Sequence, residues 1–224
     1  MAKYFTIYTS AELICLITAL VCLFRSKEYY WRLLIPFMLV ITMVEFASIP
    51  IKALYKANPI PIHSTVWLYN LLLPVQITGF AIVFYGFLNK YTKNKILVIT
   101  GAVLLYLIYI AELLTNQAGL FNFNSNTYSA MSVVLVVYSL YFYYTLLKSE
   151  EYAELKYLPE FWWVTGTLFF FFGTTAINLS YTYILTTYPG NKLYLAFITN
   201  VLIIILYGCW SYAFICKRWI TSNK

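Results

Sequence analysis

Charged residues are scarce in this sequence, and their scarcity excludes an ordinary soluble domain. Only 10% of the 224 residues are Asp, Glu, Lys or Arg, whereas 62% are apolar. Soluble domains are about 25% charged and about 45–50% apolar. Because charged side chains cover a surface that faces water, a chain with so few of them is predicted to be an integral membrane protein with the lipid bilayer as its main partner.

Aspartate is absent, histidine occurs once, and all four cysteines fall inside apolar runs. Ordinary metal sites draw on these residue types, so none is expected in the spans. Without loop cysteines, an extracellular disulfide framework is not expected either. The one histidine, His63, lies in a predicted loop, so the spans hold neither a Ser/His/Asp nor a Cys/His catalytic set. We therefore expect no metal, no cofactor and no enzymatic activity.

What the sequence has in abundance is long apolar stretches, seven of them. A helix that crosses a bilayer needs about 20 apolar residues, and no linker or second domain separates the stretches. Residues 1–224 are therefore predicted to form a single all-α domain, a polytopic membrane protein with seven transmembrane helices. The predicted spans are Ile7–Phe24, Trp31–Ile51, Thr65–Leu88, Lys95–Thr115, Tyr128–Leu147, Glu160–Leu185 and Leu193–Cys216.

The positions of the cations predict the orientation. Eleven of the fifteen Lys and Arg residues lie in or beside the loops after spans one, three and five and in the C-terminal tail. The positive-inside rule then places the N-terminus outside and the C-terminus in the cytoplasm of the inner (plasma) membrane. The net charge of +7 is attributed to this membrane-surface bias rather than to nucleic-acid binding. The apolar run at the N-terminus lacks a small-residue cleavage site, so it is interpreted as the first helix and not as a signal peptide.

Polar groups within the spans need an explanation, since they are costly in lipid. Three of the eight glutamates lie there. At about 1.5 Å per residue, Glu45 falls about 9 Å and Glu112 about 5 Å below the outer boundary. Glu12 is near the outer end of the first span and is expected to be only interfacial. The candidate ligand-binding residues are Glu45, Asn70, Gln76, Glu112, Asn178 and Asn200.

These groups gather in the outer half or at the centre of the membrane, whereas the inner half is filled with apolar runs such as residues 168–172. A bundle with a polar cavity open to the outside would need this distribution. The alternative for each amide is a hydrogen bond that joins two helices. Pro74 cannot donate a backbone hydrogen bond, which frees the Asn70 carbonyl to join the cluster. Tyr109, Tyr181 and Tyr207 are candidate aromatic lining.

Three segments suggest a resemblance: Trp67–Asn70, Val44–Phe46 and Pro159–Gly166. They resemble patterns in small uncharacterised seven-helix bacterial membrane proteins. Those proteins are similar in layout to the seven-helix sensor regions that precede some bacterial histidine kinases. The resemblance covers the whole chain, its motifs are loose, and it carries over no catalytic residue. This chain departs from the kinase layout in having no output domain after its last helix, so a signalling role would need a separate partner.

Three functions remain open at this level. The first is a receptor-like sensor that binds a small-molecule ligand in the outer cavity and signals to a cytoplasmic partner through the charged segment 148–160. The second is a small-solute or proton-coupled transporter with Glu45 as the protonatable group. The third is a structural subunit of a membrane complex, for which a dry, fully packed outer half is expected.

Overall fold

The computed structural model describes residues 7–58, 60, 64–92, 95–116, 119–149, 154–187 and 192–222. These residues form seven α-helices and two short 3₁₀ helices, and the described residues contain no strand. Each α-helix matches one predicted span, so the all-α class is confirmed. The helices are α1 (Ile7–Leu23), α2 (Tyr29–Ala57), α3 (Val66–Tyr91), α4 (Ile96–Thr115), α5 (Ser125–Lys148), α6 (Pro159–Thr187) and α7 (Lys192–Ser222), with 3₁₀ helices η2 (Gly119–Phe121) and η3 (Leu155–Tyr157).

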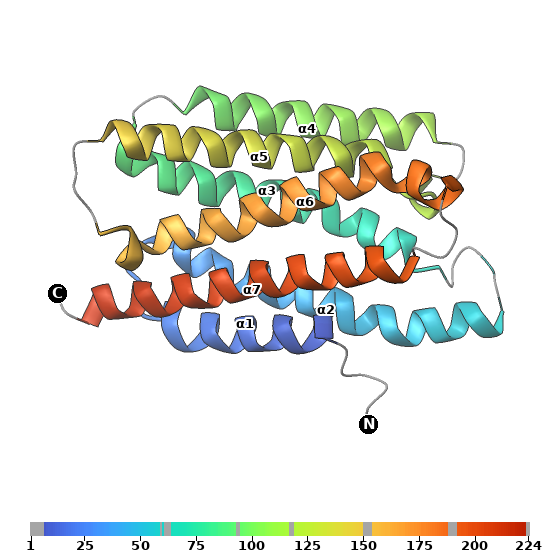
Figure 1. Ribbon diagram of the computed structural model, residues 1–224, viewed down its shortest axis with the longest axis horizontal. Coiled ribbons are helices and arrows are strands. Elements are labelled where there is room, and N and C mark those ends of the chain that lie inside the picture. The colour runs from blue at the N-terminus through green and yellow to red at the C-terminus, as the bar shows by residue number, and fades with distance from the viewer. Residues whose placement is uncertain are drawn as a thin grey trace.

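The α-helices run alternately up and down along the long axis of the molecule (Figure 1). Helix α7 packs against α1 and α6, while α3 contacts α2, α4 and α5. We call the end where α2 finishes and α3 begins the cavity end, and the other the opposite end. Helix α1 has 17 residues, whereas α2 has 29 and α7 has 31. Its first turn therefore lies beside the middle of its neighbours (Figure 1).

Length and composition of the helices fit a membrane protein. Helices α2, α3, α4, α5 and α7 are each long and apolar enough to cross a bilayer, and α1 is a shorter apolar helix. Many of their large apolar side chains face outwards, with Leu114 82% and Leu147 84% exposed. Such a surface would be costly in water, and lipid removes that cost.

An aromatic core fills the middle of the bundle on the side toward the opposite end. Trp163 of α6 and Trp210 of α7 stack with ring centroids 5.0 Å apart and planes 7° apart. Around them lie Phe80, Phe84 and Phe87 of α3, each in ring contact with Trp163 at 5.3–5.9 Å. Edge-to-face and offset stacking of this kind adds to the dispersion energy of a packed interior.

Charged groups meet at the opposite end. The Lys217 ammonium pairs with the Glu28 carboxylate just before α2, and Lys90 Nζ lies 3.6 Å from Glu160 Oε1. Burial works to raise the pKa of Glu28, but hydrogen bonds from Lys217 and Tyr30, together with the charges of Lys217 and Lys90, outweigh it and hold the pKa below the usual value. Pro159 is the first residue of α6, as its lack of an N–H favours.

Close approach of α6 to α7 depends on Gly166. A Cβ added there would lie 2.8 Å from Cys209 Cβ and 3.0 Å from the Leu206 carbonyl oxygen, which is backbone and cannot rotate away. We expect Gly166→Ala to lower the free energy of unfolding by about 1–3 kcal/mol through overpacking. Thermal unfolding in detergent would measure it.

Gly208→Ala is the matched control, because nothing lies within 4 Å of an added Cβ at that position of α7. Alanine favours a helix over glycine by about 1 kcal/mol, so this variant should be as stable as the parent or more so. Equal stability of the two variants would contradict the observed helix approach.

Candidate functional site: a polar cavity at one end of the bundle

A cavity of about 1680 Å³ opens at the cavity end. Its walls come from the last turns of α2, the first turns of α3 and α5, the start of α1 and the middle of α6 and α7. Apolar and aromatic side chains form most of the lining, and a few carboxyl, ammonium, hydroxyl and amide groups interrupt it. The polar lining residues are Thr9, Glu12, Glu45, Lys52, Lys56, Tyr69, Gln76, Ser125, Tyr128, Ser129 and Tyr207.

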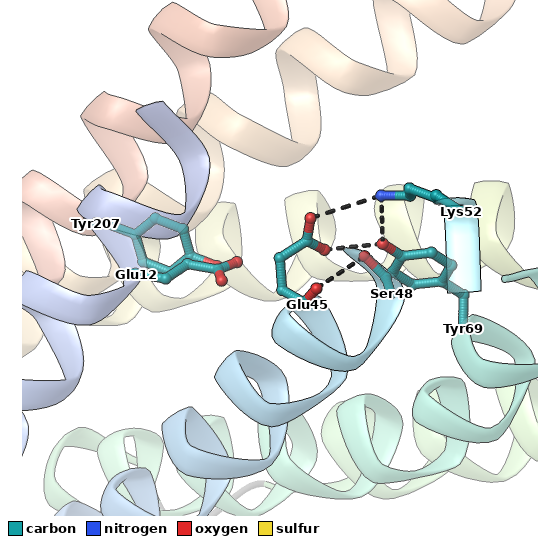
Figure 2. A network of polar contacts seen from close by, with 6 residues as sticks. All are labelled: Glu12, Glu45, Ser48, Lys52, Tyr69 and Tyr207. Atoms are coloured by element: carbon teal, nitrogen blue, oxygen red, sulfur yellow. Dashed lines mark hydrogen bonds and ion pairs between the residues drawn. The ribbon is translucent and has the colours of Figure 1, made fainter. Parts of the chain in front are cut away.

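Glu45 lines the cavity, as expected, and has partners in the protein. The Tyr69 hydroxyl of α3 donates to Glu45 Oε2 at 2.8 Å, and Lys52 Nζ lies 3.7 Å from Glu45 Oε1. Lys52 also donates to the Tyr69 hydroxyl at 3.5 Å. Lys52 is seven residues after Glu45 and therefore on the same face of α2. Figure 2 shows the resulting triad of carboxylate, ammonium and phenol.

The position of Glu12 differs from the sequence prediction, which placed this residue at the membrane interface. Its side chain is only 7% exposed, and the Tyr207 hydroxyl of α7 donates to Glu12 Oε1 at 2.8 Å. Since α1 starts beside the middle of α7, the first turns of α1 lie inside the bundle. Depth was predicted from position within α1 alone, and the length of α7 relative to α1 was the missing information.

Asn70 does not line the cavity. Its Nδ2 donates to the carbonyl oxygens of Leu120 and Asn122 at 2.8 and 2.7 Å, and its Oδ1 accepts from the Asn124 backbone N–H at 3.1 Å. The fully buried amide thus holds the α4–α5 connection against α3. The sequence analysis gave a hydrogen bond between two helices as the alternative to ligand binding. Asn70 follows that alternative, except that it joins a helix to a loop.

The carbonyl freed by Pro74 is also used within the protein rather than in the cavity. The Tyr109 hydroxyl of α4 donates to the Asn70 carbonyl oxygen at 3.2 Å. Tyr109 is buried and, contrary to expectation, does not line the cavity. A neighbouring helix therefore compensates the missing backbone hydrogen bond, as membrane helices that contain proline require.

Glu112 is a further correction, because its carboxylate caps α5 instead of lining the cavity. Its Oε2 accepts from the backbone N–H and the hydroxyl of Thr127 at 2.8 and 2.7 Å, and Oε1 accepts from the Asn126 N–H at 3.1 Å. The first N–H groups of a helix lack intrahelical partners and carry partial positive charge. A carboxylate on α4 here supplies what a capping side chain on α5 otherwise would.

Three predicted residues remain. Gln76 lines the cavity, and within the described residues its side chain amide makes no hydrogen bond. Asn200 is not among the lining residues, and its Oδ1 is buried without a hydrogen-bond partner in the described part of the chain. The side chains of Asn178 and Tyr181 are outside the described part of the structure, whereas Tyr207 lines the cavity as expected.

The cavity therefore joins residues that the sequence analysis kept apart. Glu12 was assigned to the interface, Lys52 and Lys56 follow the predicted end of the second span, and Tyr69 was not a candidate site residue. In the structure, α2 continues six residues beyond its predicted end at Ile51, which carries both lysines into the helix. We found no match to this chain among protein-family models, curated proteins or solved structures.

Proposed function

We propose that this protein is a receptor-like membrane sensor that binds a small ligand in the cavity. In this proposal the cavity end faces the outside and the C-terminus faces the cytoplasm. The observation that supports it best is the contrast between the two ends of the bundle. A cavity with charged and hydroxyl groups lies at one end, and a packed aromatic core lies toward the other.

The lining is of the kind that recognises a small molecule. Ligand sites are concave and mostly apolar, with a few polar groups that fix orientation. Ile203, Leu206 and Phe170 supply apolar wall, while Gln76 and Glu12 supply polar atoms. Polar groups at membrane depth are expensive unless they are paired or meet water or a ligand, so a binding role accounts for groups that packing leaves unsatisfied.

A chain of contacts leads from the cavity to the opposite end. The Tyr207 ring in the cavity wall meets Trp210 edge-to-face at 5.9 Å, and Trp210 stacks on Trp163. Trp162 is the residue before Trp163 in α6, and its Nε1–H donates to the Lys156 carbonyl oxygen of η3 at 3.0 Å. A ligand that shifts α7 against α6 would thus move the segment that we assign to a cytoplasmic partner.

The transporter alternative requires a path to the opposite end in some state. Trp163, Trp210, Phe80 and Phe84 would have to separate, and all four are buried. We therefore place it second. For a structural subunit we would expect a dry and fully packed cavity end, so the cavity argues against that function. Uptake of a labelled solute into proteoliposomes would favour transport over sensing.

Orientation and access can be tested together by cysteine labelling, after the four native cysteines are replaced by alanine. Ser129 lines the cavity, and we expect Ser129→Cys to react with a membrane-impermeant thiol reagent added to intact cells. Lys148→Cys at the end of α5 is the matched variant at the opposite end. It should react only after the membrane is permeabilised.

The reverse pattern would place the cavity in the cytoplasm and overturn the proposed orientation. An unreactive Ser129→Cys under both conditions would mean that the cavity is closed to solutes, and the receptor proposal would fail. For the signalling step, crosslinking from Lys156 should recover a cytoplasmic protein whose yield changes when ligand is added.

A further inference from the structure

The Glu12 carboxyl group has one oxygen that the protein does not use. Oε1 accepts the hydrogen bond from Tyr207, whereas Oε2 is buried and has no hydrogen-bond partner among the described residues. The residue lines the cavity and is more than nine-tenths buried. Because an unsatisfied buried acceptor is costly, Oε2 marks a position where a bound molecule could supply a donor.

Glu45 differs from Glu12 in having partners of its own. One oxygen accepts from Tyr69, and Lys52 lies near the other at 3.7 Å, which is longer than a hydrogen bond. Figure 2 shows the Glu12 carboxyl turned toward Glu45, with Lys52 on the far side of Glu45. The space between the two carboxyl groups is therefore flanked by acceptor oxygens from α1 and α2. The Lys52 ammonium pairs with Glu45 and not with Glu12.

Two lysines follow Glu45 along the same helix. Lys52 and Lys56 are seven and eleven residues after Glu45, which places their backbones about 10 and about 16 Å farther along α2. The Lys52 side chain reaches back to Glu45, whereas no ion pair reaches Glu12 within the described part of the chain, so the Glu12 side of the site has no cation of the protein. Aromatic rings also line the cavity, namely Tyr128, Phe170 and Tyr207, and ring faces attract cations.

Resting on the proposed function, we propose that the ligand carries a primary ammonium group that binds between Glu12 and Glu45. An ammonium has three N–H donors and no acceptor. One N–H donates to Glu12 Oε2 and a second to Glu45 Oε1, while the carbon skeleton lies against Ile203 and Leu206. A free amine and the headgroup of phosphatidylethanolamine share this chemistry.

The test uses the full chain in phosphatidylcholine nanodiscs with four six-carbon probes: hexylamine, hexyltrimethylammonium, hexanoate and hexanol. We expect hexylamine to raise the melting temperature and to bind at least about tenfold more tightly than the other three. Hydrogen bonds to a charged group contribute about 1.5–3 kcal/mol, which corresponds to about 10-fold to 100-fold in affinity. Equal affinity of hexyltrimethylammonium would overturn the hydrogen-bonded ammonium.

Glu12→Gln should weaken hexylamine binding by at least about tenfold, because an amide supplies a weaker, uncharged acceptor. Glu154→Gln makes the same charge change at an exposed position of the opposite end and should bind hexylamine as the parent does. Unchanged hexylamine affinity in Glu12→Gln would also overturn the proposal. The comparison of the four probes on the parent protein needs no variant and holds even if Glu12→Gln fails to fold.

Two outcomes separate the ammonium proposal from the proposed function. If Ser129→Cys is reactive from outside but hexanoate or hexanol is the probe preferred, the cavity binds ligands and the ammonium proposal is wrong. If no probe binds and Ser129→Cys is unreactive, both fail. Replacing part of the phosphatidylcholine by phosphatidylethanolamine identifies the source: competition with hexylamine indicates a lipid headgroup, and its absence indicates a free amine. Either result supports the ammonium site.

Discussion

Asn70→Ala is expected to lower the free energy of unfolding by about 3–5 kcal/mol. The substitution leaves two carbonyl oxygens, those of Leu120 and Asn122, and the N–H of Asn124 without their partner. Each buried polar group that loses its hydrogen bond costs about 1–3 kcal/mol. The Asn70 side chain is 0% exposed, so water cannot easily replace the amide. Thermal or denaturant unfolding in detergent would measure the loss.

Gln76→Ala is the matched control for Asn70→Ala, because it removes a carboxamide from the same helix where that amide makes no hydrogen bond within the described residues. Its cost should be below about 1 kcal/mol, and its effect should fall on ligand binding. If Asn70→Ala kept its stability but lost ligand binding, the loop-fastening role would be wrong, and the sequence prediction of a ligand-binding residue would be supported.

The second large effect is expected for Trp163→Ala, with a loss of about 3–5 kcal/mol. Removal of a large buried side chain costs the transfer free energy of the lost atoms and the cavity left behind. Trp163 is 0% exposed and contacts Phe84, Phe87 and Trp210 with ring centroids 5.0–5.5 Å apart. Its neighbours lie on two other helices, α3 and α7, so the gap cannot close by the movement of one side chain.

Trp219→Ala provides the control, since Trp219 is 64% exposed at the end of α7 and its removal leaves no interior gap. We expect its melting temperature in detergent to stay close to that of the parent. A comparable small loss for Trp163→Ala would mean that the aromatic core is loosely packed. The argument against a transport path would then lose its basis.

Much of the fold follows from the sequence because a long apolar run predicts a membrane helix. Six of the seven predicted spans begin within two residues of the observed helix, and α5 begins three residues earlier than predicted. The C-terminal ends of α2 and α7 were predicted too early, because polar residues continue these helices beyond the apolar run. Lys52 and Lys56 extend α2 beyond Ile51, and Lys217 and Trp219 extend α7 beyond Cys216, because the helix does not stop where the apolar run stops.

The candidate site was harder to predict, and Glu45, Asn70 and Glu112 show why. All three are polar groups in helical turns near the cavity end, yet one lines the cavity, one fastens a loop and one caps a helix. A constant rise per residue converts sequence position into depth. Nothing comparable converts it into direction when a helix is apolar on all sides, because no polar stripe marks its inner face.

The helical class, the number of helices and the concentration of polar groups toward one end were predictable from the residues alone, since each depends on composition along a single helix. Which polar groups share a space depends instead on how the helices pack against one another. The short α1 brings Glu12 to the middle of α7, and the rotation of α3 and α4 turns Asn70 and Glu112 toward the α4–α5 connection. Those rotations are set by side-chain packing between helices, a property of pairs of helices that no single stretch of sequence contains.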